Sequence, residues 1–253
     1  MAFFQHGTSQ IYYEVTGHGT PLLFLPGVTD SISRHSDWLQ RTARDHRVIA
    51  ADLPGSGRSG PQPRRYHASY YQDDAASFAA LLAELDLPSA HLVGFSDGGE
   101  VALMMAVATP AMARSVLVWG ASGHSDDPGG QIAGLFRNLF EQPAPETQDW
   151  RDYLVAHYGA GLARDITRNI ADGVDAVVAA GGDISRSRAH LIQCPVCLIA
   201  GKNDGFVPPG LLMALAGRIA TVETHVVDGA GHGVHQDRPD WFAATLTDWL
   251  ARH

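Results

Sequence analysis

The sequence predicts an α/β fold in which a mostly parallel central sheet carries helices on both of its faces. Short, continuously apolar runs alternate along the chain with longer segments whose apolar residues recur at helical spacing. Continuous apolar runs are typical of parallel strands that are buried on both faces. The third observation is Gly94-Phe95-Ser96-Asp97-Gly98, a Gly-x-Ser-x-Gly sequence that lies between one such strand and one such helix.

The N-terminal half begins with a two-stranded hairpin and then alternates between strands and helices. The hairpin joins residues 2–6 to residues 10–15, and the apolar runs that follow predict strands over 22–25, 47–51, 91–93 and 115–119. Helices are expected around Trp38, over residues 70–85, and directly after Ser96. This order of elements requires crossover connections, which place the strands parallel to one another.

The alternation stops between residues 120 and 190, where the sequence shows helical spacing and no strand pattern. It resumes with a strand, a helix, a strand and a helix over 196–200, 209–219, 224–228 and 239–251. We therefore expect residues 1–120 and 191–253 to form the α/β core of the protein, with the sheet at its centre. Residues 121–190 are expected to form a helical cap or lid insertion above the sheet.

The chain has 253 residues, of which 45% are hydrophobic, enough for one large α/β domain with an insertion. Its 18 basic and 27 acidic residues give a net charge of −9, which argues against nucleic acid or an anionic membrane as a partner. No apolar stretch reaches membrane-spanning length, and residues 1–6 lack the pattern of a signal peptide. We therefore expect a cytoplasmic protein with no membrane partner.

Cys194 and Cys197 are the only cysteines, and they lie three residues apart in a strand pattern. Side chains three apart on a strand face opposite sides of the sheet, which does not suit a shared metal ion or a redox pair. We expect both thiols to be reduced core residues. The sequence predicts no metal site and no cofactor.

The Gly-x-Ser-x-Gly sequence is typical of a nucleophile held at a sharp turn between a strand and a helix. A serine at the tip of such a turn adopts a strained backbone conformation, so small residues must flank it. The N-terminus of the following helix leaves backbone N–H groups unpaired, and its dipole favours negative charge. Acyl transfer requires at least a nucleophile and a site that stabilises negative charge, and Ser96 beside this helix N-terminus could supply both.

Serine becomes a good nucleophile only when an oriented base removes its proton. Among thirteen histidines, His232 lies in a glycine-rich loop just past the last predicted strand, and Asp204 lies just past the preceding strand. Both positions belong to the carboxyl edge of the sheet, where Ser96 is also expected. The chain order Ser96, Asp204, His232 is the order that this architecture uses.

With these residues in place, the sequence resembles the α/β-hydrolase superfamily over nearly its whole length. The segments that carry the resemblance are Leu22–Val28, Asp52–Ser59, Gly94–Gly99, Gly201–Pro208 and Gly229–His232. The resemblance implies that Ser96 is the nucleophile and that His232 is the general base and then the general acid. It also implies that Asp204 holds the imidazole tautomer.

The resemblance further implies an oxyanion hole made by two backbone N–H groups, those of Asp97 and Val28. Many relatives carry His-Gly where this chain has Pro26-Gly27. The glycine turn is kept here, but the side-chain hydrogen bond that often braces the loop is missing.

Some relatives carry the acid after the strand that ends here at Trp119, so two rival assignments stay open. Asp126 and Asp127 follow that strand, further into a loop rich in glycine and proline. His235 is expected to cap or pack rather than to act as the base. Candidate substrate-binding residues around the expected site are Asp30, Phe95, Trp119, His124, Phe136, Phe140 and Val207.

The Ser-Asp-Gly-Gly form of the turn resembles the valacyclovirase branch, whose members hydrolyse amino-acid esters. There the acidic residue after the nucleophile helps to recognise a substrate ammonium group, which implies the same role for Asp97. Asp30, beside the oxyanion turn, is a candidate for a second carboxylate. The alternative is that Asp97 only stabilises the N-terminus of its helix.

The sequence therefore predicts a cofactor-independent serine hydrolase that cleaves a small carboxylic ester or lactone through an acyl-enzyme. The same triad in this fold also serves carbon–carbon bond hydrolysis, perhydrolysis and lyase reactions, so these alternatives stay open. A receptor-like homologue that binds a ligand is a third interpretation. The expected partner is a small-molecule substrate, and the oligomeric state, monomer or homodimer, is left open.

Overall fold

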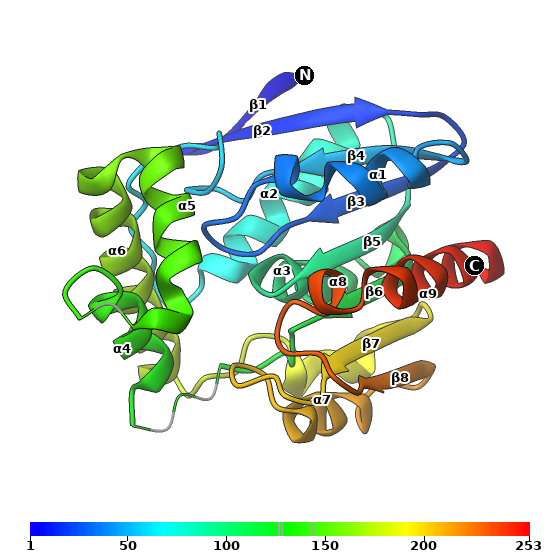
Figure 1. Cartoon of the computed structure of the whole chain (residues 1–253). Coiled ribbons are helices and arrows are strands. Elements are labelled where there is room, and N and C mark those ends of the chain that lie inside the picture. Colours follow the sequence, from blue (N-terminus) through cyan, green and yellow to red (C-terminus); the bar gives the residue numbers. More distant parts are fainter. Residues whose placement is uncertain (126, 128, 143) are drawn as a thin grey trace.

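The computed structural model describes residues 1–125, 127, 129–142 and 144–253 (Figure 1). Within these residues the strands form one eight-stranded sheet in the order β1-β2-β4-β3-β5-β6-β7-β8. β2 pairs antiparallel with β1 and β4, and the other pairs are parallel, which confirms the predicted sheet. The strands are β1 Ala2–His6, β2 Ser9–Thr16, β3 Thr20–Leu25, β4 His46–Ala51, β5 Ala90–Phe95, β6 Ala113–Trp119, β7 Val196–Gly201 and β8 Val222–Val227.

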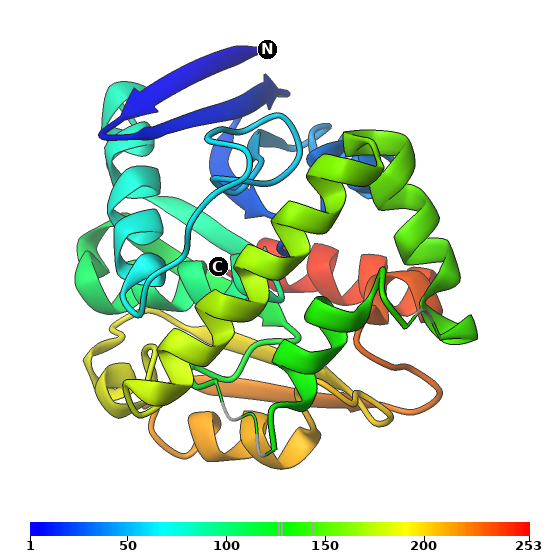
Figure 2. The ribbon, with the colours of Figure 1, turned by 90° about the vertical axis from the view of Figure 1, so that its left-hand side faces the viewer.

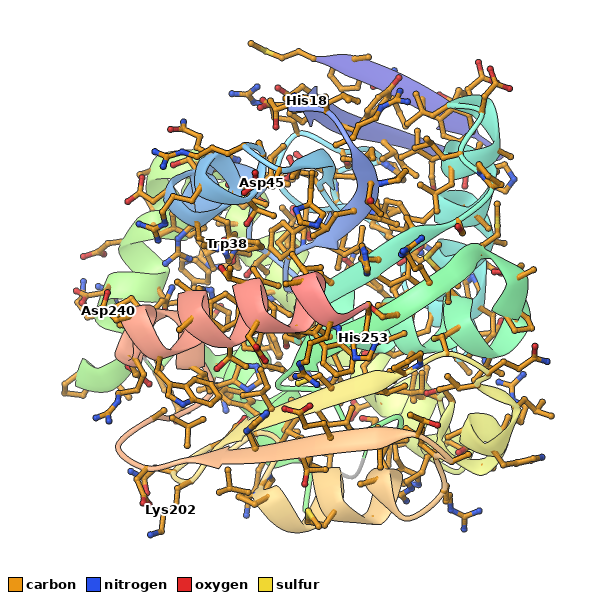
Figure 3. All side chains as sticks on the ribbon, turned by 90° about the vertical axis from the view of Figure 1, so that its right-hand side faces the viewer. His18, Trp38, Asp45, Lys202, Asp240 and His253 are labelled. Atoms are coloured by element: carbon orange, nitrogen blue, oxygen red, sulfur yellow. The ribbon has the colours of Figure 1, made fainter. Side chains whose placement is uncertain are left out.

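Helices cover both faces of this sheet, as the sequence predicts. One face carries α2 Tyr70–Glu84, α3 Asp97–Ala108 and α7 Pro209–Ala216, and the other carries α1 Ser36–Thr42, α8 Val234–Asp237 and α9 Pro239–Arg252. Figure 3 shows α9 running across the second face from Asp240 to His253, with Trp38 of α1 next to it. Short 3-10 helices lie at η1 Ile32–His35, η2 Pro110–Met112, η3 Pro145–Thr147 and η4 Arg186–Leu191.

Two apolar cores lie on the two faces, because successive strand residues point to opposite sides of a sheet. On β5, Leu92 belongs to the core under α2 and α3, whereas Val93 belongs to the core under α1 and α9. Cys194, which lies two residues before β7 and not in the strand as expected, and Cys197, on β7, belong to different cores, and both are free and buried. This agrees with the prediction that the thiols are reduced core residues.

The chain between β6 and β7 forms helices α4 Gln131–Asn138, α5 Gln148–Tyr158 and α6 Ala160–Ala179. In Figure 1 the arrows of β3, β5 and β7 point toward these helices, and Figure 2 shows the helices crossing in front of the sheet. They also bury an apolar cluster of their own around Phe136 and Ile166. The exact division of the chain into a core and a cap stays a prediction.

The described helices differ in length, and the longest of them, α6 with 20 residues, is amphipathic. In the part of the chain that the structure describes, none of them combines the length and the apolar character needed to cross a membrane.

Candidate active site

Ser96 lies at the sharp turn between β5 and α3. Its backbone has a φ of 52° and a ψ of −123°, and residues other than glycine rarely adopt a positive φ. The Ser96 N–H donates a hydrogen bond of 2.9 Å to the carbonyl oxygen of Trp119, which fixes the turn to β6. Strain of this kind persists only where the surrounding structure imposes it, and here it places Ser96 at the wall of a cavity.

The two glycines of the turn are required by close backbone contacts. A Cβ at Gly94 would lie 2.4 Å from the carbonyl oxygen of Gly98, and a Cβ at Gly98 would lie 2.2 Å from the carbonyl oxygen of Leu25. The start of α3 is therefore packed directly against the loop that follows β3. In that loop, a Cβ at Gly27 would lie 3.3 Å from the Cβ of Ser96, so the loop also runs beside Ser96.

His232 and Asp204 complete a hydrogen-bonded chain with Ser96. His232 follows β8 and Asp204 follows β7, so both lie past the carboxyl ends of their strands. The Nε2 atom of His232 is 3.0 Å from Ser96 Oγ, and its Nδ1 atom is 2.9 Å from Asp204 Oδ2. Asp204 is buried, and its other oxygen accepts the N–H groups of Phe206 and Val207 at 2.8 and 2.9 Å.

The carboxylate of Asp204 selects the tautomer of His232, because an ionised carboxylate only accepts hydrogen bonds. The Nδ1 atom therefore carries the proton, and Nε2 presents its lone pair to the Ser96 hydroxyl. The structure brings together the three side chains that the sequence singled out, in an arrangement that can move a proton from serine to histidine.

Of the two rival acids, Asp127 has another role and Asp126 lies outside the described residues. The carboxylate of Asp127 accepts the N–H groups of Ile132 and Ala133 at 2.8 and 3.0 Å. These are orphan donors of the first turn of α4, so Asp127 stabilises the start of that helix.

The sequence model of the alpha/beta hydrolase family matches residues 22–245, a range that contains Ser96, Asp204 and His232. The chain belongs to the alpha/beta hydrolase family. Among its relatives, Serine hydrolase BPHL from Homo sapiens is 26% identical over 247 residues, which cover 95% of this chain and 83% of that protein. The 2-hydroxymuconate semialdehyde hydrolase of Pseudomonas sp. (strain CF600) is 26% identical over 259 residues, which cover 93% and 88%.

Solved structures share the alpha/beta hydrolase fold at lower sequence identity. The enol-lactonase from Burkholderia xenovorans LB400 has a TM-score of 0.80 at 16% identity, covering 99% of this chain and 100% of that chain. The likeness at this identity concerns the fold alone. Together with the family match, it confirms the fold that the sequence resemblance implied.

In this alpha/beta hydrolase, a cavity of about 310 Å³ lies between the carboxyl edge of the sheet and helices α4 to α6. Ser96 and His232 line it, and so do Val28 and Asp97, whose N–H groups are the expected oxyanion donors. Apolar side chains such as Ile132, Phe136 and Trp150 form much of the rest of the lining. A mostly apolar lining with a few polar groups is typical of small-molecule sites. The predicted substrate-binding residues that line the cavity are Asp30, Phe95, His124, Phe136 and Val207.

Two predicted substrate-binding residues, Trp119 and Phe140, are not among the described residues that line the cavity. Trp119 is fully buried in the core under α1 and α9, and its indole N–H donates to Nδ1 of His235 at 3.0 Å. The same contact shows that His235 packs, as expected. Phe140 packs in a separate cluster beside α5 because α4 ends at Asn138, so its apolar stripe does not continue to residue 140.

Two acidic residues of α3, Asp97 and Glu100, line one side of the cavity, here called the acidic wall. Asp97 is hydrogen-bonded to two tyrosines. The hydroxyls of Tyr70 and Tyr71 donate to Asp97 Oδ1 at 2.9 and 2.8 Å. Burial raises the pKa of the Asp97 carboxyl, and the two hydroxyl donors counteract part of that rise. A partly desolvated carboxyl group therefore lies one residue after Ser96.

Glu100, in the first turn of α3, adds a second carboxyl group to this wall. Its oxygens accept the N–H groups of Ser122 and Gly123 at distances of 2.8, 2.9 and 3.1 Å. Burial raises the pKa of Glu100 to about 7, and the charge of Asp97 adds to the effect. Glu100 thus ties the segment after β6 to α3 while it shares the cavity wall with Asp97.

Asp30 lines the cavity, but its carboxylate already has other partners. It accepts hydrogen bonds of 2.8 Å from the Ser31 N–H and from Nε2 of His35, and Nη1 of Arg34 lies 3.5 Å away. Burial favours the protonated form, yet the bond to His35 and the nearby Arg34 hold the pKa of Asp30 below its ordinary value. The candidate second carboxylate for an ammonium is therefore occupied within the protein.

Sequence reasoning missed Glu100 and the tyrosine pair. Glu100 lies three residues after Asp97, and that spacing places both on one face of a helix, so it could have been found. Tyr70 and Tyr71 reach Asp97 from a helix that lies more than twenty residues earlier in the chain. No local pattern indicates that contact.

Among the described residues, one group of three metal-ligating side chains comes together, namely Cys197, Glu223 and His225. Glu223 already accepts a hydrogen bond of 2.8 Å from His225 and pairs with Arg252 at 2.9 Å. Burial raises the pKa of the Cys197 thiol to about 12, which opposes formation of the thiolate that a metal requires. These groups therefore favour their present partners over an ion.

Proposed function

We propose that this protein is a serine hydrolase that cleaves a small carboxylic ester or lactone through an acyl-enzyme on Ser96. The observation that carries the proposal is the hydrogen-bonded chain from Ser96 Oγ through His232 to Asp204 at the wall of the cavity. Membership of the alpha/beta hydrolase family and the similarity to Serine hydrolase BPHL support this reaction class.

In the acylation step, Nε2 of His232 takes the proton of the Ser96 hydroxyl while Oγ attacks the substrate carbonyl carbon. The imidazolium keeps its Nδ1 proton, which stays hydrogen-bonded to Asp204, and gives the Nε2 proton to the departing alkoxide. A water molecule then attacks the acyl-enzyme, with Nε2 of His232 as its base. The carboxylic acid leaves, and the Ser96 hydroxyl is restored.

We assign the oxyanion hole to the backbone N–H groups of Val28 and Asp97. Asp97 opens α3, so its N–H has no acceptor within the helix. Val28 belongs to the loop of residues 26–31, here called the oxyanion loop, which packs against the start of α3 and beside Ser96. A single donor of this kind is worth about 3 kcal/mol in the transition state.

Helices α4, α5 and α6 serve as a cap in this proposal, with residues 121–190 as the insertion and 1–120 and 191–253 as the core. Phe136, Trp150 and Ile170, one from each helix, line the cavity along with Ser96. A roof of this kind excludes water and strengthens electrostatic interactions with a bound substrate.

The acidic wall favours substrates that carry an amine, and amino-acid esters are the subclass that fits it. Asp97 and Glu100 place two carboxyl groups in a largely apolar cavity, where a substrate ammonium would balance their charge. Asp30 contributes less, because its carboxylate already accepts a hydrogen bond from His35 and pairs with Arg34.

The proposal is tested by the kinetics of aryl ester hydrolysis. The native chain should show a burst of aryl alcohol followed by slower steady turnover, and Ser96→Ala should remove the burst and nearly all turnover. Unchanged turnover in Ser96→Ala would refute the assignment of the nucleophile. If aryl esters are not hydrolysed while a vinylogous 1,5-diketone is cleaved, carbon–carbon bond hydrolysis replaces ester hydrolysis as the proposed reaction. Binding of these compounds without any turnover would indicate a receptor.

The amine preference is tested with pairs of aminoacyl esters and their N-acylated forms. We expect kcat/KM to be at least about tenfold higher for the free amine, a difference of about 1.4 kcal/mol. Asp97→Ala should erase this preference while neutral esters are still hydrolysed. Asp37→Ala, which removes an exposed carboxylate from the first turn of α1, is the matched control. Equal values for both ester forms in the native chain would eliminate amine recognition.

A further inference from the structure

Three aromatic residues of α5 donate hydrogen bonds to the oxyanion loop. The Trp150 indole N–H donates to Thr29 Oγ1 at 3.2 Å, and the Tyr158 hydroxyl donates to the Thr29 carbonyl oxygen at 3.3 Å. The Tyr153 hydroxyl donates to Ser31 Oγ at 3.3 Å. Spacings of three and eight residues place these side chains on one face of the helix, so α5 presents a face of donors to the loop.

Thr29 has a backbone conformation that needs support. It is buried and has a φ of 66°, which is an outlier for a β-branched residue. The Asp30 N–H donates to the Gly27 carbonyl oxygen at 3.2 Å, so residues 27–30 form a turn with Thr29 in its third position. Turns with a positive φ at that position favour glycine or asparagine, and threonine is stable there only if its surroundings hold it.

Each polar group of Thr29 is held, and two of its three partners come from α5. The third partner is Ser56, whose Oγ accepts the Thr29 N–H at 2.9 Å. The Tyr158 hydroxyl also accepts the Gly57 N–H at 2.6 Å, so it joins the oxyanion loop to the loop after β4. Burial raises the pKa of Tyr158, which keeps its hydroxyl protonated as a donor.

We propose that Tyr158 and Trp150 are positioning residues that hold Thr29 in its left-handed conformation and thereby aim the Val28 N–H at the oxyanion. This inference rests on the proposed function, in which Val28 supplies one oxyanion donor. In a relaxed turn with a negative φ, the Val28–Thr29 peptide would rotate and the loop would shift against Ser96. The oxyanion loop would then lose the alignment on which transition-state stabilisation depends.

Many relatives have a histidine at position 26, whose side-chain hydrogen bond holds the loop, and this chain has proline there. The hydrogen bonds from α5 replace that support. The relaxed loop would still admit substrate but would stabilise the oxyanion poorly. The site would therefore be fully active only while α5 rests on the oxyanion loop.

Tyr158→Phe is the primary test, because it removes one hydroxyl and keeps the ring. Tyr158 is not among the described residues that line the cavity, so its substitution leaves the substrate contacts in place. We expect kcat for an aryl ester to fall about tenfold with KM within about twofold of the native value, since only the transition state is affected. Trp249→Phe, which removes a buried 3.1 Å bond to Ser115 Oγ under α9, is the control and should leave kcat unchanged.

A double-mutant cycle with Thr29→Gly separates positioning from general destabilisation. Glycine keeps the backbone carbonyl that Tyr158 contacts, yet it adopts a positive φ without support. In the Thr29→Gly background, Tyr158→Phe should therefore lower kcat by less than about threefold. An equal loss in both backgrounds, or no loss in either, would overturn the proposal.

Amide hydrogen exchange over residues 27–31 provides a readout that does not depend on turnover. Tyr158→Phe should accelerate exchange in this segment, and Trp249→Phe should not. If the native chain hydrolyses no ester, the proposed function fails, and the exchange result alone decides whether α5 holds the loop. If Tyr158→Phe leaves the exchange rates of residues 27–31 unchanged, the proposal that Tyr158 holds the oxyanion loop is wrong.

Discussion

At the scale of single residues, the two oxygens of Asp204 have separate partners. Oδ2 faces Nδ1 of His232 at 2.9 Å, while Oδ1 accepts two backbone N–H groups from the turn after β7. The backbone bonds fix the orientation of the carboxylate, and the remaining oxygen selects the tautomer of His232. Orientation and tautomer selection can therefore be separated by substitution.

Asp204→Asn should lower kcat by about 10⁴-fold while the free energy of unfolding changes little. The amide oxygen can still accept the two backbone N–H groups, but the amide nitrogen would donate toward His232 and impose the wrong tautomer. Steady-state kinetics and chemical denaturation measure the two effects. Asp127→Asn, which alters a carboxylate that accepts the N–H groups of Ile132 and Ala133, is the matched control and tests the rival acid. A larger kcat loss in Asp127→Asn than in Asp204→Asn would reverse the assignment.

The hydrogen-bonded residues Ser96, His232 and Asp204 could be predicted as candidates because each follows a strand in a recognisable turn. Ser96 has its glycines, and His232 and Asp204 each lie just past a strong strand pattern. The direction of a side chain on a fully buried strand is harder to predict, because a continuous apolar run does not distinguish the two faces. Trp119 was therefore expected at the site, although its side chain lies in the core under α1 and α9.

At the scale of elements, the start of α3 and the oxyanion loop form one packed unit. The carbonyl oxygens of Leu25 and Pro26 would lie 2.2 and 2.4 Å from a Cβ at Gly98. There is no room for a side chain between the helix and the loop. The spacing between the two proposed oxyanion donors is therefore set by backbone contact.

Gly98→Ala should lower kcat/KM at least about 100-fold, because the new methyl group must push the oxyanion loop away from α3. Gly161→Ala is the control, since a Cβ at this position in α6 meets nothing within 4 Å. The control should keep its activity and gain up to about 1 kcal/mol of stability from the higher helix propensity of alanine. A folded Gly98→Ala protein with native kinetics would contradict the assigned oxyanion geometry.

The helices of the insertion could be predicted from their spacing, but their contacts with the core could not. Trp150 and Tyr153 mark the apolar side of a helix in the sequence, yet their partners Thr29 and Ser31 lie about 120 residues earlier. Helical spacing shows which residues share a face and says nothing about what that face meets. The hydrogen bonds from α5 to Thr29 therefore can be recognised only from the three-dimensional structure.

At the scale of the whole molecule, several buried carboxyl groups are held by hydrogen bonds from other segments of the chain. Asp74 receives two hydrogen bonds of 2.7 Å from Arg64, and Asp52 accepts N–H groups of Ile32 and Arg58 at 2.8 Å. Burial raises the pKa of both aspartates to about 6, and the pKa of Glu100 to about 7. These groups make stability depend on pH near neutrality.

The folded chain holds a proton on Glu100 at pH values where the unfolded chain has released it. Its contribution to stability is therefore complete below pH 4.5 and is lost as the pH rises through about 7, a change of about 3 kcal/mol. Glu100→Gln should flatten this part of the curve of unfolding free energy against pH, measured by urea denaturation between pH 4.5 and 8. The exposed Glu84→Gln should leave the curve unchanged. A native curve with the same slope over this range as the curve of Glu100→Gln would contradict the shift.

The most direct measurement of the central claim is the mass of a trapped acyl-enzyme. The protein is mixed with a slowly hydrolysed aryl ester, quenched in acid during the burst, digested and analysed by mass spectrometry. We predict an acyl group on Ser96 in the native chain and none in Ser96→Ala. Steady turnover with the acyl group on another residue, or with no covalent adduct at any time point, would contradict the account.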